Sequence, residues 1–164
     1  MRVSTHDDPD AVRPGTPVPV PGNDLDRATC LELLRSSRLG RVGLSVDALP
    51  VIVPVGFEVV GDHIVLGAHV DPRELAAIDG VVVAFEADAW DPERGEGWSV
   101  LVQGPARRLV DRADLGPLPD RGSPAWLTED TEVVVVTTDV IHGVRLVAGR
   151  APRHASHATS HARV

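Results

Sequence analysis

Short apolar segments, separated by polar or glycine-containing dipeptides, fill the middle of the chain. Three of them, residues 41–46, 49–60 and 63–68, are rich in Val, Ile and Leu and are joined by Asp47-Ala48 and Gly61-Asp62. Two-residue connections of this kind are typical of tight hairpins between antiparallel strands. The pattern therefore predicts three antiparallel strands that follow one another along the chain.

The second half of the chain continues the pattern. Residues 80–87 form a continuous apolar run, which is typical of a buried strand, and after the polar residues 88–97 a long strand is predicted over 98–110. Gly104-Pro105 interrupts that strand and indicates a bulge or a corner where a barrel bends. The two remaining strands are predicted over residues 132–138 and 141–147.

Two short helices are predicted among these strands. The first begins after Asp26, a residue type that favours the N-cap, and Gly40 is expected to end it. Its apolar face contains Cys30, the only cysteine, so a packed and inert thiol is expected there. The second begins at Asp71-Pro72-Arg73-Glu74, with Asp at the N-cap and Pro at N1. Six or seven strands without βαβ alternation indicate a mainly β fold, a small antiparallel barrel.

Both ends of the chain differ in composition from this predicted domain. Residues 1–22 contain repeated Pro and Gly, which predicts an extended or disordered arm. Residues 150–164 are small, polar and basic, which predicts a disordered tail, and its three histidines are expected to have only incidental metal affinity. The folded domain is therefore predicted over residues 23–149.

The charged residues exclude several classes of protein. All sixteen basic residues are Arg, so the chain has neither a Schiff-base lysine nor a Walker A phosphate loop, and it lacks Tyr as well. A formal charge of −8 argues against a nucleic-acid partner. There is no apolar run of membrane-spanning length, no leader-like start, and no second cysteine for an internal disulfide. A soluble cytoplasmic protein without a membrane partner is expected.

Several local patterns indicate a ligand site on the predicted strands. Arg41 begins one strand, and residues 54–57 interrupt the next with Pro and Gly, which allows a flat ligand to approach the backbone closely. Arg73, in the first turn of the second helix, is expected to form an anion site because Arg binds phosphate through paired hydrogen bonds. Glu86 and Asp88 share one strand face, where a solvated strand end is favoured over a catalytic acid pair.

In their order and spacing, these segments resemble the pyridoxamine 5'-phosphate oxidase-like family of flavin-binding split barrels, especially its actinobacterial-type branch. The resemblance covers about residues 25–146. It is carried by Cys30-Leu31-Glu32-Leu33-Leu34, Leu39-Gly40-Arg41-Val42-Gly43, Val53-Pro54-Val55, Val83-Ala84-Phe85-Glu86, Gly97-Trp98-Ser99-Val100-Leu101-Val102-Gln103-Gly104 and Gly143-Val144-Arg145. It implies a six-stranded antiparallel split β-barrel of the FMN-binding type, and a homodimer with two FMN sites at the subunit interface.

The resemblance also implies which residues hold FMN. Two guanidinium groups are expected to neutralise the FMN phosphate, those of Arg41 and Arg73. Backbone segments are expected to border the isoalloxazine ring around Val42, Gly43, Pro54, Val55 and Phe57. The ribityl chain is expected near Gly67 and Ala68. The segment that closes the site from the neighbouring subunit is expected to contain Trp98 and Ser99.

The function implied by the resemblance is hydride transfer between bound FMN and a small organic substrate, with a deazaflavin coenzyme as the alternative cofactor. A non-catalytic flavin- or haem-binding dimer and a barrel without any ligand are further alternatives. Relatives place Ser or Thr beside the cation at the phosphate end, whereas this chain has Val70-Asp71-Pro72-Arg73. Asp71 is expected to weaken FMN binding by charge repulsion. Oxidation of vitamin B6 is not expected, since the substrate-phosphate residues of true pyridoxamine phosphate oxidases are not recognisable.

Overall fold

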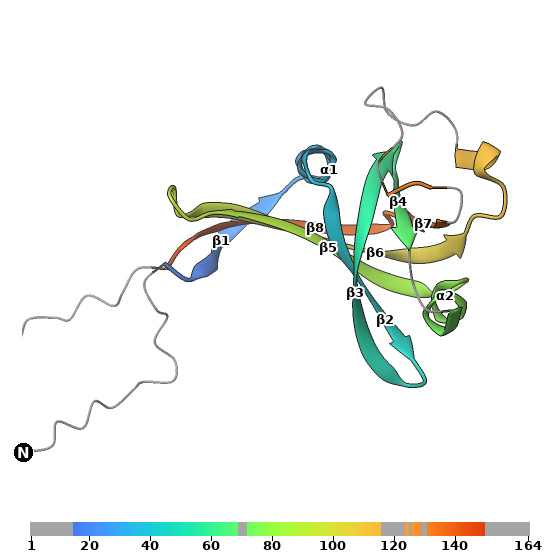
Figure 1. Ribbon diagram of the computed structural model, residues 1–164. Coiled ribbons are helices and arrows are strands. Elements are labelled where there is room, and N and C mark those ends of the chain that lie inside the picture. The colour runs from blue at the N-terminus through green and yellow to red at the C-terminus, as the bar shows by residue number, and fades with distance from the viewer. Residues whose placement is uncertain (1–14, 69–71, 116–123, 125, 129–130, 150–164) are drawn as a thin grey trace, which may run out of the picture.

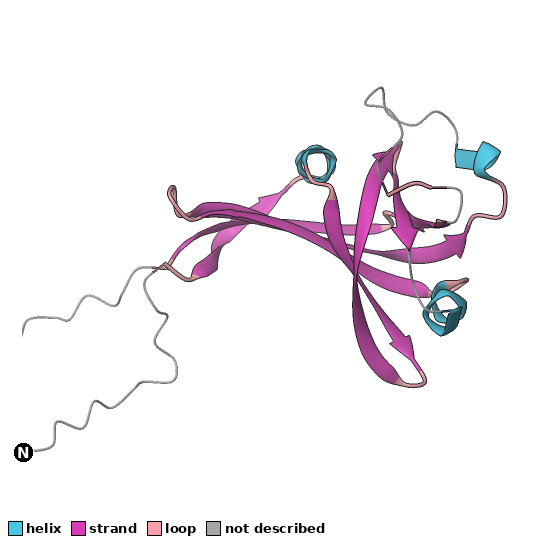
Figure 2. Ribbon diagram, in the orientation of Figure 1, coloured by secondary structure: helices cyan, strands magenta, loops and turns pink. Residues whose placement is uncertain are grey.

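The computed structural model describes residues 15–68, 72–115, 124, 126–128 and 131–149 (Figure 1). Strands dominate this part of the chain, as the magenta ribbons of Figure 2 show. The described strands are β1 (Pro17–Leu25), β2 (Leu39–Val46), β3 (Leu49–Val60), β4 (His63–Ala68), β5 (Val82–Asp91), β6 (Glu96–Arg108), β7 (Glu132–Thr137) and β8 (Val140–Ala148). The described helices are α1 (Arg27–Ser36), α2 (Pro72–Ile78) and the 3-10 turn η1 (Arg112–Leu115).

Six of the described strands close into a barrel. The sheet order is β1-β8-β6-β5-β2-β3-β4-β7, and a further pairing between β6 and β7 joins the two ends of the ring formed by β2 to β7. Strands β8 and β1 lie outside the ring, as an extension that begins on β6 and leads away from the barrel (Figure 1). The predicted six-stranded antiparallel split barrel is therefore confirmed.

The barrel closes at the Gly104-Pro105 position. Up to Gln103, β6 pairs with β8, and from Ala106 onward it pairs with β7. Pairing of β6 with β5 continues through both residues without a register shift, so the position is a corner and not a bulge. A Cβ atom on Gly104 would overlap the carbonyl oxygen of Thr137. Glycine at this position therefore lets β6 and the end of β7 approach closely enough to close the ring.

The interior of the barrel holds the hydrophobic core. Phe57 and Phe85 are fully buried and meet edge to face, with ring centroids 4.8 Å apart. Helix α1 packs against β3, β6 and β8, and α2 packs against β2 and β6. The N-cap prediction for α1 is confirmed, because the Asp26 carboxylate accepts a hydrogen bond from the Thr29 amide at 2.7 Å.

Three element boundaries differ from those predicted. Helix α1 ends with Ser37 as its C-cap rather than at Gly40, which lies inside β2 directly against the Phe85 ring. Strand β1 begins at Pro17, within the segment predicted as an arm, because it pairs with β8; its prolines are tolerated because it is an edge strand. Strand β5 continues to Asp91, so the predicted polar loop is only a short turn. Residues 1–14 and the predicted tail 150–164 lie outside the described residues.

Candidate functional site

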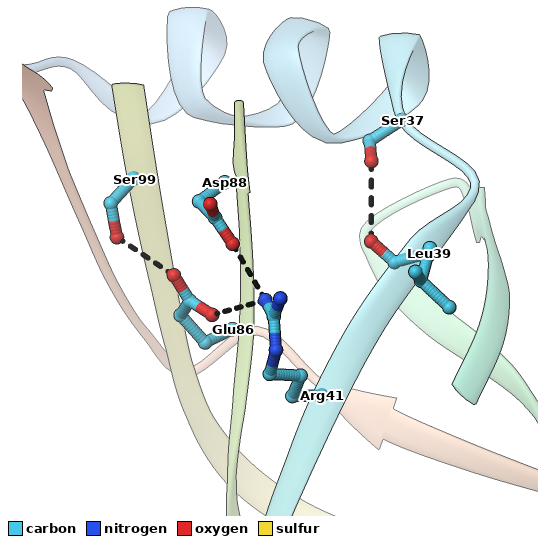
Figure 3. A network of polar contacts seen from close by, with 6 residues as sticks. All are labelled: Ser37, Leu39, Arg41, Glu86, Asp88 and Ser99. Carbon is cyan, nitrogen blue, oxygen red and sulfur yellow. Dashed lines mark hydrogen bonds and ion pairs between the residues drawn. The ribbon is translucent and has the colours of Figure 1, made fainter. Parts of the chain in front are cut away.

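A polar cluster lies on the outer face of the barrel, where β2 pairs with β5. Arg41 and Glu86 are cross-strand partners. Nη1 of Arg41 donates to Oδ1 of Asp88 at 2.6 Å and to Oε2 of Glu86 at 3.3 Å (Figure 3). The Ser99 hydroxyl of β6 donates to Oε1 of Glu86 at 3.1 Å. The cluster thus joins two of the predicted site residues, Arg41 and Ser99, through a carboxylate that connects them.

The charges in this cluster do not cancel. Two carboxylates share a single guanidinium, so the group carries a net negative charge. The hydrogen bond and the charge of Asp88, followed by the charge of Glu86, raise the pKa of Arg41 above its ordinary value. About half of the Arg41 side chain is exposed. A phosphate that approaches Arg41 must therefore compete with the carboxylates of Glu86 and Asp88. These two residues were predicted to be a solvated strand end, and the structure shows in addition that both are ion-paired with Arg41.

A second feature lies on β3 and β4, beside this cluster. Pro54 of β3 is the cross-strand partner of Arg41, and two residues further along β3, Gly56 is the partner of Gly67 on β4. These two glycines, which we call the glycine platform, lack side chains at adjacent positions of the sheet. The indole ring of Trp126 lies directly on them: a Cβ on Gly56 would be 2.7 Å from Cγ, and one on Gly67 would be 2.5 Å from Cζ3.

A hydrogen bond from a threonine side chain holds the backbone of Trp126 at this position. The Thr131 hydroxyl donates to the Trp126 carbonyl oxygen at 2.7 Å and accepts from the Thr128 amide at 3.0 Å. The indole Nε1–H is buried and has no acceptor within the described part of the chain.

Neither Trp126 nor Gly56 was among the predicted site residues. The glycine in residues 54–57 did indicate close approach by a flat group, and the group found there is a side chain of the protein itself.

Three predicted site residues point into the barrel. The side chains of Val42, Val55 and Phe57 are buried in the core, so only their backbone is available to a ligand on the outer face. Gly43 and Pro54 occupy the outer face, between the core positions on their strands. The prediction that the backbone of these segments borders a ring is compatible with this placement and stays a prediction.

Trp98 and Ser99 follow one another on β6 and therefore face opposite sides of the sheet. Ser99 lies on the outer face with Glu86, whereas Trp98 packs against the edge of the core. The paired role predicted for them, closing a site on the neighbouring subunit, stays a prediction. Their opposite orientations mean that a single ligand contacts both only if one of them contributes its backbone.

The phosphate end of the predicted site is described in part. Helix α2 begins at Pro72, as predicted, and Arg73 lies exposed in its first turn; Asp71 lies outside the described residues. Ala68 ends β4, next to Gly67. The guanidinium of Arg41 turns toward β5 (Figure 3). The structure therefore brings Gly67 and Ala68 close to Pro54, but it does not show Arg41 and Arg73 acting on one anion.

Two cavities are present on the described surface. One, of about 310 Å³, is lined by valines of β3, β4 and β7 and by Pro105 and Leu109, with His63, Arg107 and Asp114 among its polar residues. The other, of about 400 Å³, lies between the β2–β3 hairpin and α2 and includes Gly43. Neither Arg41 nor Arg73 lines either cavity. Within the described residues there is no cluster of metal-ligating side chains, and no helix long and apolar enough to cross a membrane.

Known proteins are similar to this chain in sequence and in fold. The family model described as pyridoxamine 5'-phosphate oxidase matches residues 26–143. An uncharacterised protein of Mycobacterium tuberculosis is 37% identical over 131 residues, which are 76% of this chain and 86% of that protein. The structure of an FAD-binding protein from Mycobacterium smegmatis is 33% identical, covers 76% of this chain and 98% of its own, and superimposes with a TM-score of 0.63.

A more distant structure shares the fold alone. The FAD- and haem-binding protein of Mycobacterium smegmatis is 21% identical, covers 81% of this chain and 77% of its own, and has a TM-score of 0.60. The family match covers the six barrel strands and both α-helices, the part of the chain that contains the polar cluster and the glycine platform. One of the solved structures similar to this chain is thus that of an FAD-binding protein. The chain itself belongs to the pyridoxamine 5'-phosphate oxidase-like family of split barrels.

Proposed function

We propose that this protein binds FMN on the outer face of the barrel and transfers a hydride between the flavin and a small organic substrate. The glycine platform carries the proposal. Two adjacent strands have no side chains at Gly56 and Gly67, so an aromatic ring can lie in direct contact with their backbone, as the indole of Trp126 does. A planar isoalloxazine needs the same kind of surface. The FAD-binding relative with 33% identity supports a flavin as the ligand.

The residues around the platform are suited to the parts of the flavin. The backbone of β3 next to the platform, from Pro54 to Phe57, offers amides and carbonyls to the ring edge. Ala68 directly follows the platform residue Gly67 and lies along the expected path of the ribityl chain toward Arg73, whose guanidinium binds the phosphate. Arg41 becomes a second phosphate ligand only when Asp88 and Glu86 release it. Bound flavin supplies the hydride chemistry, and the protein supplies binding and orientation.

FAD is a second candidate ligand, favoured by the relative from Mycobacterium smegmatis. Both nucleotides share the isoalloxazine ring and the first phosphate, so the glycine platform and Arg73 serve either of them. A deazaflavin coenzyme has the same planar outline and is the alternative for hydride transfer without oxygen chemistry. Comparing the affinities of these compounds for one preparation of the protein identifies the cofactor.

We also propose that the protein is a homodimer. Several large apolar side chains are exposed on the outer face of the barrel, among them Leu39 (59% exposed), Ile52 (71%) and Val82 (69%). A concentration of exposed apolar side chains on one face indicates a protein contact surface. They lie on β2, β3 and β5, the strands that carry the polar cluster and part of the platform, so a second subunit on this face would cover the flavin.

The experiment that tests the proposal is an FMN titration of the wild type, of Arg73→Ala and of Arg145→Ala. Arg145 is an exposed arginine on β8, on the opposite face of the sheet from the polar cluster, and serves as the matched control. Loss of the phosphate contact weakens FMN binding of Arg73→Ala by about tenfold or more. The control keeps the wild-type affinity. Equal affinities of Arg73→Ala and the wild type would remove Arg73 from the site.

A further inference from the structure

The indole of Trp126 occupies the surface on which the flavin is proposed to lie. We infer that Trp126 is a built-in occupant of the glycine platform and that the isoalloxazine ring binds by displacing it. The inference rests on the proposed function and goes beyond it, because it assigns to a residue of this chain the control of access to the cofactor site. It follows from the contact of Trp126 with Gly56 and Gly67.

The indole lies flat across two strands. Its five-membered ring is over Gly56, where an added Cβ would be 2.7 Å from Cγ and 3.0 Å from Nε1. Its six-membered ring is over Gly67, where an added Cβ would be 2.5 Å from Cζ3 and 2.7 Å from Cδ2. Because Gly56 and Gly67 are cross-strand partners, their backbone forms one continuous surface that is two strands wide. Only one aromatic ring can lie on it at a time.

The indole of Trp126 lies on the platform without a hydrogen bond from its N–H group to any described residue. Its Nε1–H is buried without an acceptor among the described residues, and a buried donor without a partner costs free energy relative to the same donor in water. The backbone of the residue is held independently, through the Thr131 hydroxyl on the Trp126 carbonyl oxygen. Displacement of the side chain leaves this backbone hydrogen bond unbroken, and the indole N–H regains water when the ring leaves the platform.

Mutually exclusive occupancy has a measurable consequence. A ligand that binds only when the indole is displaced has its apparent affinity reduced by the fraction of molecules in which the platform is open. Removing the indole removes that reduction. Trp126→Ala is therefore expected to bind FMN more tightly than the wild type. A residue that formed a wall of the site would show the opposite, because its loss would remove contacts from the bound flavin.

The experiment is an FMN titration of the full chain, followed by the quenching of FMN fluorescence, for the wild type, Trp126→Ala and Trp90→Ala. Trp90 is a matched control because its indole also lies against a glycine, Gly97, on the β5–β6 hairpin away from the platform. We expect the dissociation constant of Trp126→Ala to be about tenfold or more lower than that of the wild type. The control keeps the wild-type value.

A second pair of variants covers the case in which the alanine variant does not fold. Trp126→Leu keeps an apolar side chain at this position but offers no flat ring, and it should also bind FMN more tightly than the wild type. Gly67→Ala places a methyl group on the platform itself and should weaken FMN binding about tenfold or more, since neither ring can then lie flat.

The outcomes distinguish the inference from the proposed function. Unchanged or weaker FMN binding by the Trp126 variants, with binding by the wild type intact, overturns the displacement of Trp126 and leaves the flavin site standing. Absence of FMN binding by the wild type and by every variant overturns the proposed function and this inference with it. Tighter binding by Trp90→Ala as well would show a general loosening of the chain and would also overturn the inference.

Discussion

Arg41 on β2 and Asp88 on β5 form an ion pair on the outer face of the barrel, beside the glycine platform, with 2.6 Å between Nη1 and Oδ1. Glu86 shares the same guanidinium at 3.3 Å. Arg41, one of the two cations predicted to bind the flavin phosphate, is therefore already paired with two carboxylates. The free energy of phosphate binding at Arg41 therefore depends on the cost of breaking its ion pairs with Asp88 and Glu86. Substitution of either carboxylate tests this dependence.

Asp88→Asn is expected to strengthen FMN binding. The amide keeps an acceptor near Arg41 but removes a negative charge that repels the phosphate, so the dissociation constant should fall about three- to tenfold at low ionic strength. The gain should shrink as salt is added, because exposed charges are screened. Asp62→Asn is the matched control, since Asp62 is also paired with an arginine, Arg27, outside the polar cluster. Equal FMN affinity of Asp88→Asn and the wild type would show that the phosphate does not approach Arg41.

Gly104→Ala is expected to destabilise the barrel. Its Cβ would overlap the Thr137 carbonyl oxygen, a backbone atom that cannot rotate away, at the point where β6 leaves β8 and joins β7. The free energy of unfolding should fall by about 2–3 kcal/mol, measured by urea denaturation. Gly43→Ala is the control on the same barrel, because a Cβ there meets nothing closer than 3.7 Å. A Gly104→Ala protein as stable as the control would contradict the closure described at this corner.

The Cys30 thiol is expected to resist alkylation in the folded protein. It is fully buried on α1, where its Sγ lies 3.7 Å from the Leu25 carbonyl oxygen. Burial, and to a smaller extent the charge of Asp26, raise the pKa of this thiol, which lowers the fraction of reactive thiolate at any given pH. Titration with a thiol reagent at pH 8 should show one group that reacts only after denaturant is added. Rapid reaction in native buffer would contradict the placement of α1.

Asp26→Ala is expected to lower the melting temperature in a pH-dependent way. Hydrogen bonds from Thr29 lower the pKa of the Asp26 carboxyl below its ordinary value in the folded protein. The resulting stabilisation is present above the ordinary pKa and is lost as the pH falls through the lowered one. At pH 7 the variant should melt about 2–5 °C below the wild type. Thermal melts should show the difference shrinking below pH 4; a constant difference would mean that the charge of Asp26 does not contribute.

Local patterns were sufficient for the barrel strands and the fold class, but they missed β1 and were insufficient for the site. The alternation of apolar residues and the dipeptide turns predicted β2, β3 and β4, because hairpin geometry depends on neighbouring residues. Gly104-Pro105 predicted a bulge or a corner inside β6, and the structure has a corner there. The register of β2 against β5 is set by the whole barrel, so the ion pair of Arg41 with Asp88 was not predictable from spacing.

The contact of Trp126 with the platform shows the same limit more sharply. Trp126 is 59 residues beyond Gly67 in the sequence and reaches it only because β7 pairs with β4. A glycine within an otherwise apolar strand indicated that some group approaches the backbone closely. Nothing in the local sequence identified that group as an indole of the same chain, because side-chain contacts between distant segments depend on the assembled fold.

The most direct test of flavin binding is the visible spectrum of the purified full chain after incubation with FMN and removal of free flavin by gel filtration. The proposed function predicts retained flavin bands at about one flavin per chain, as expected for a symmetric dimer with two equivalent sites. Parallel incubations with FAD and with a deazaflavin coenzyme identify the preferred ligand. A protein that emerges colourless from all three, and that binds none of them in titrations at micromolar concentration, would contradict the flavin site.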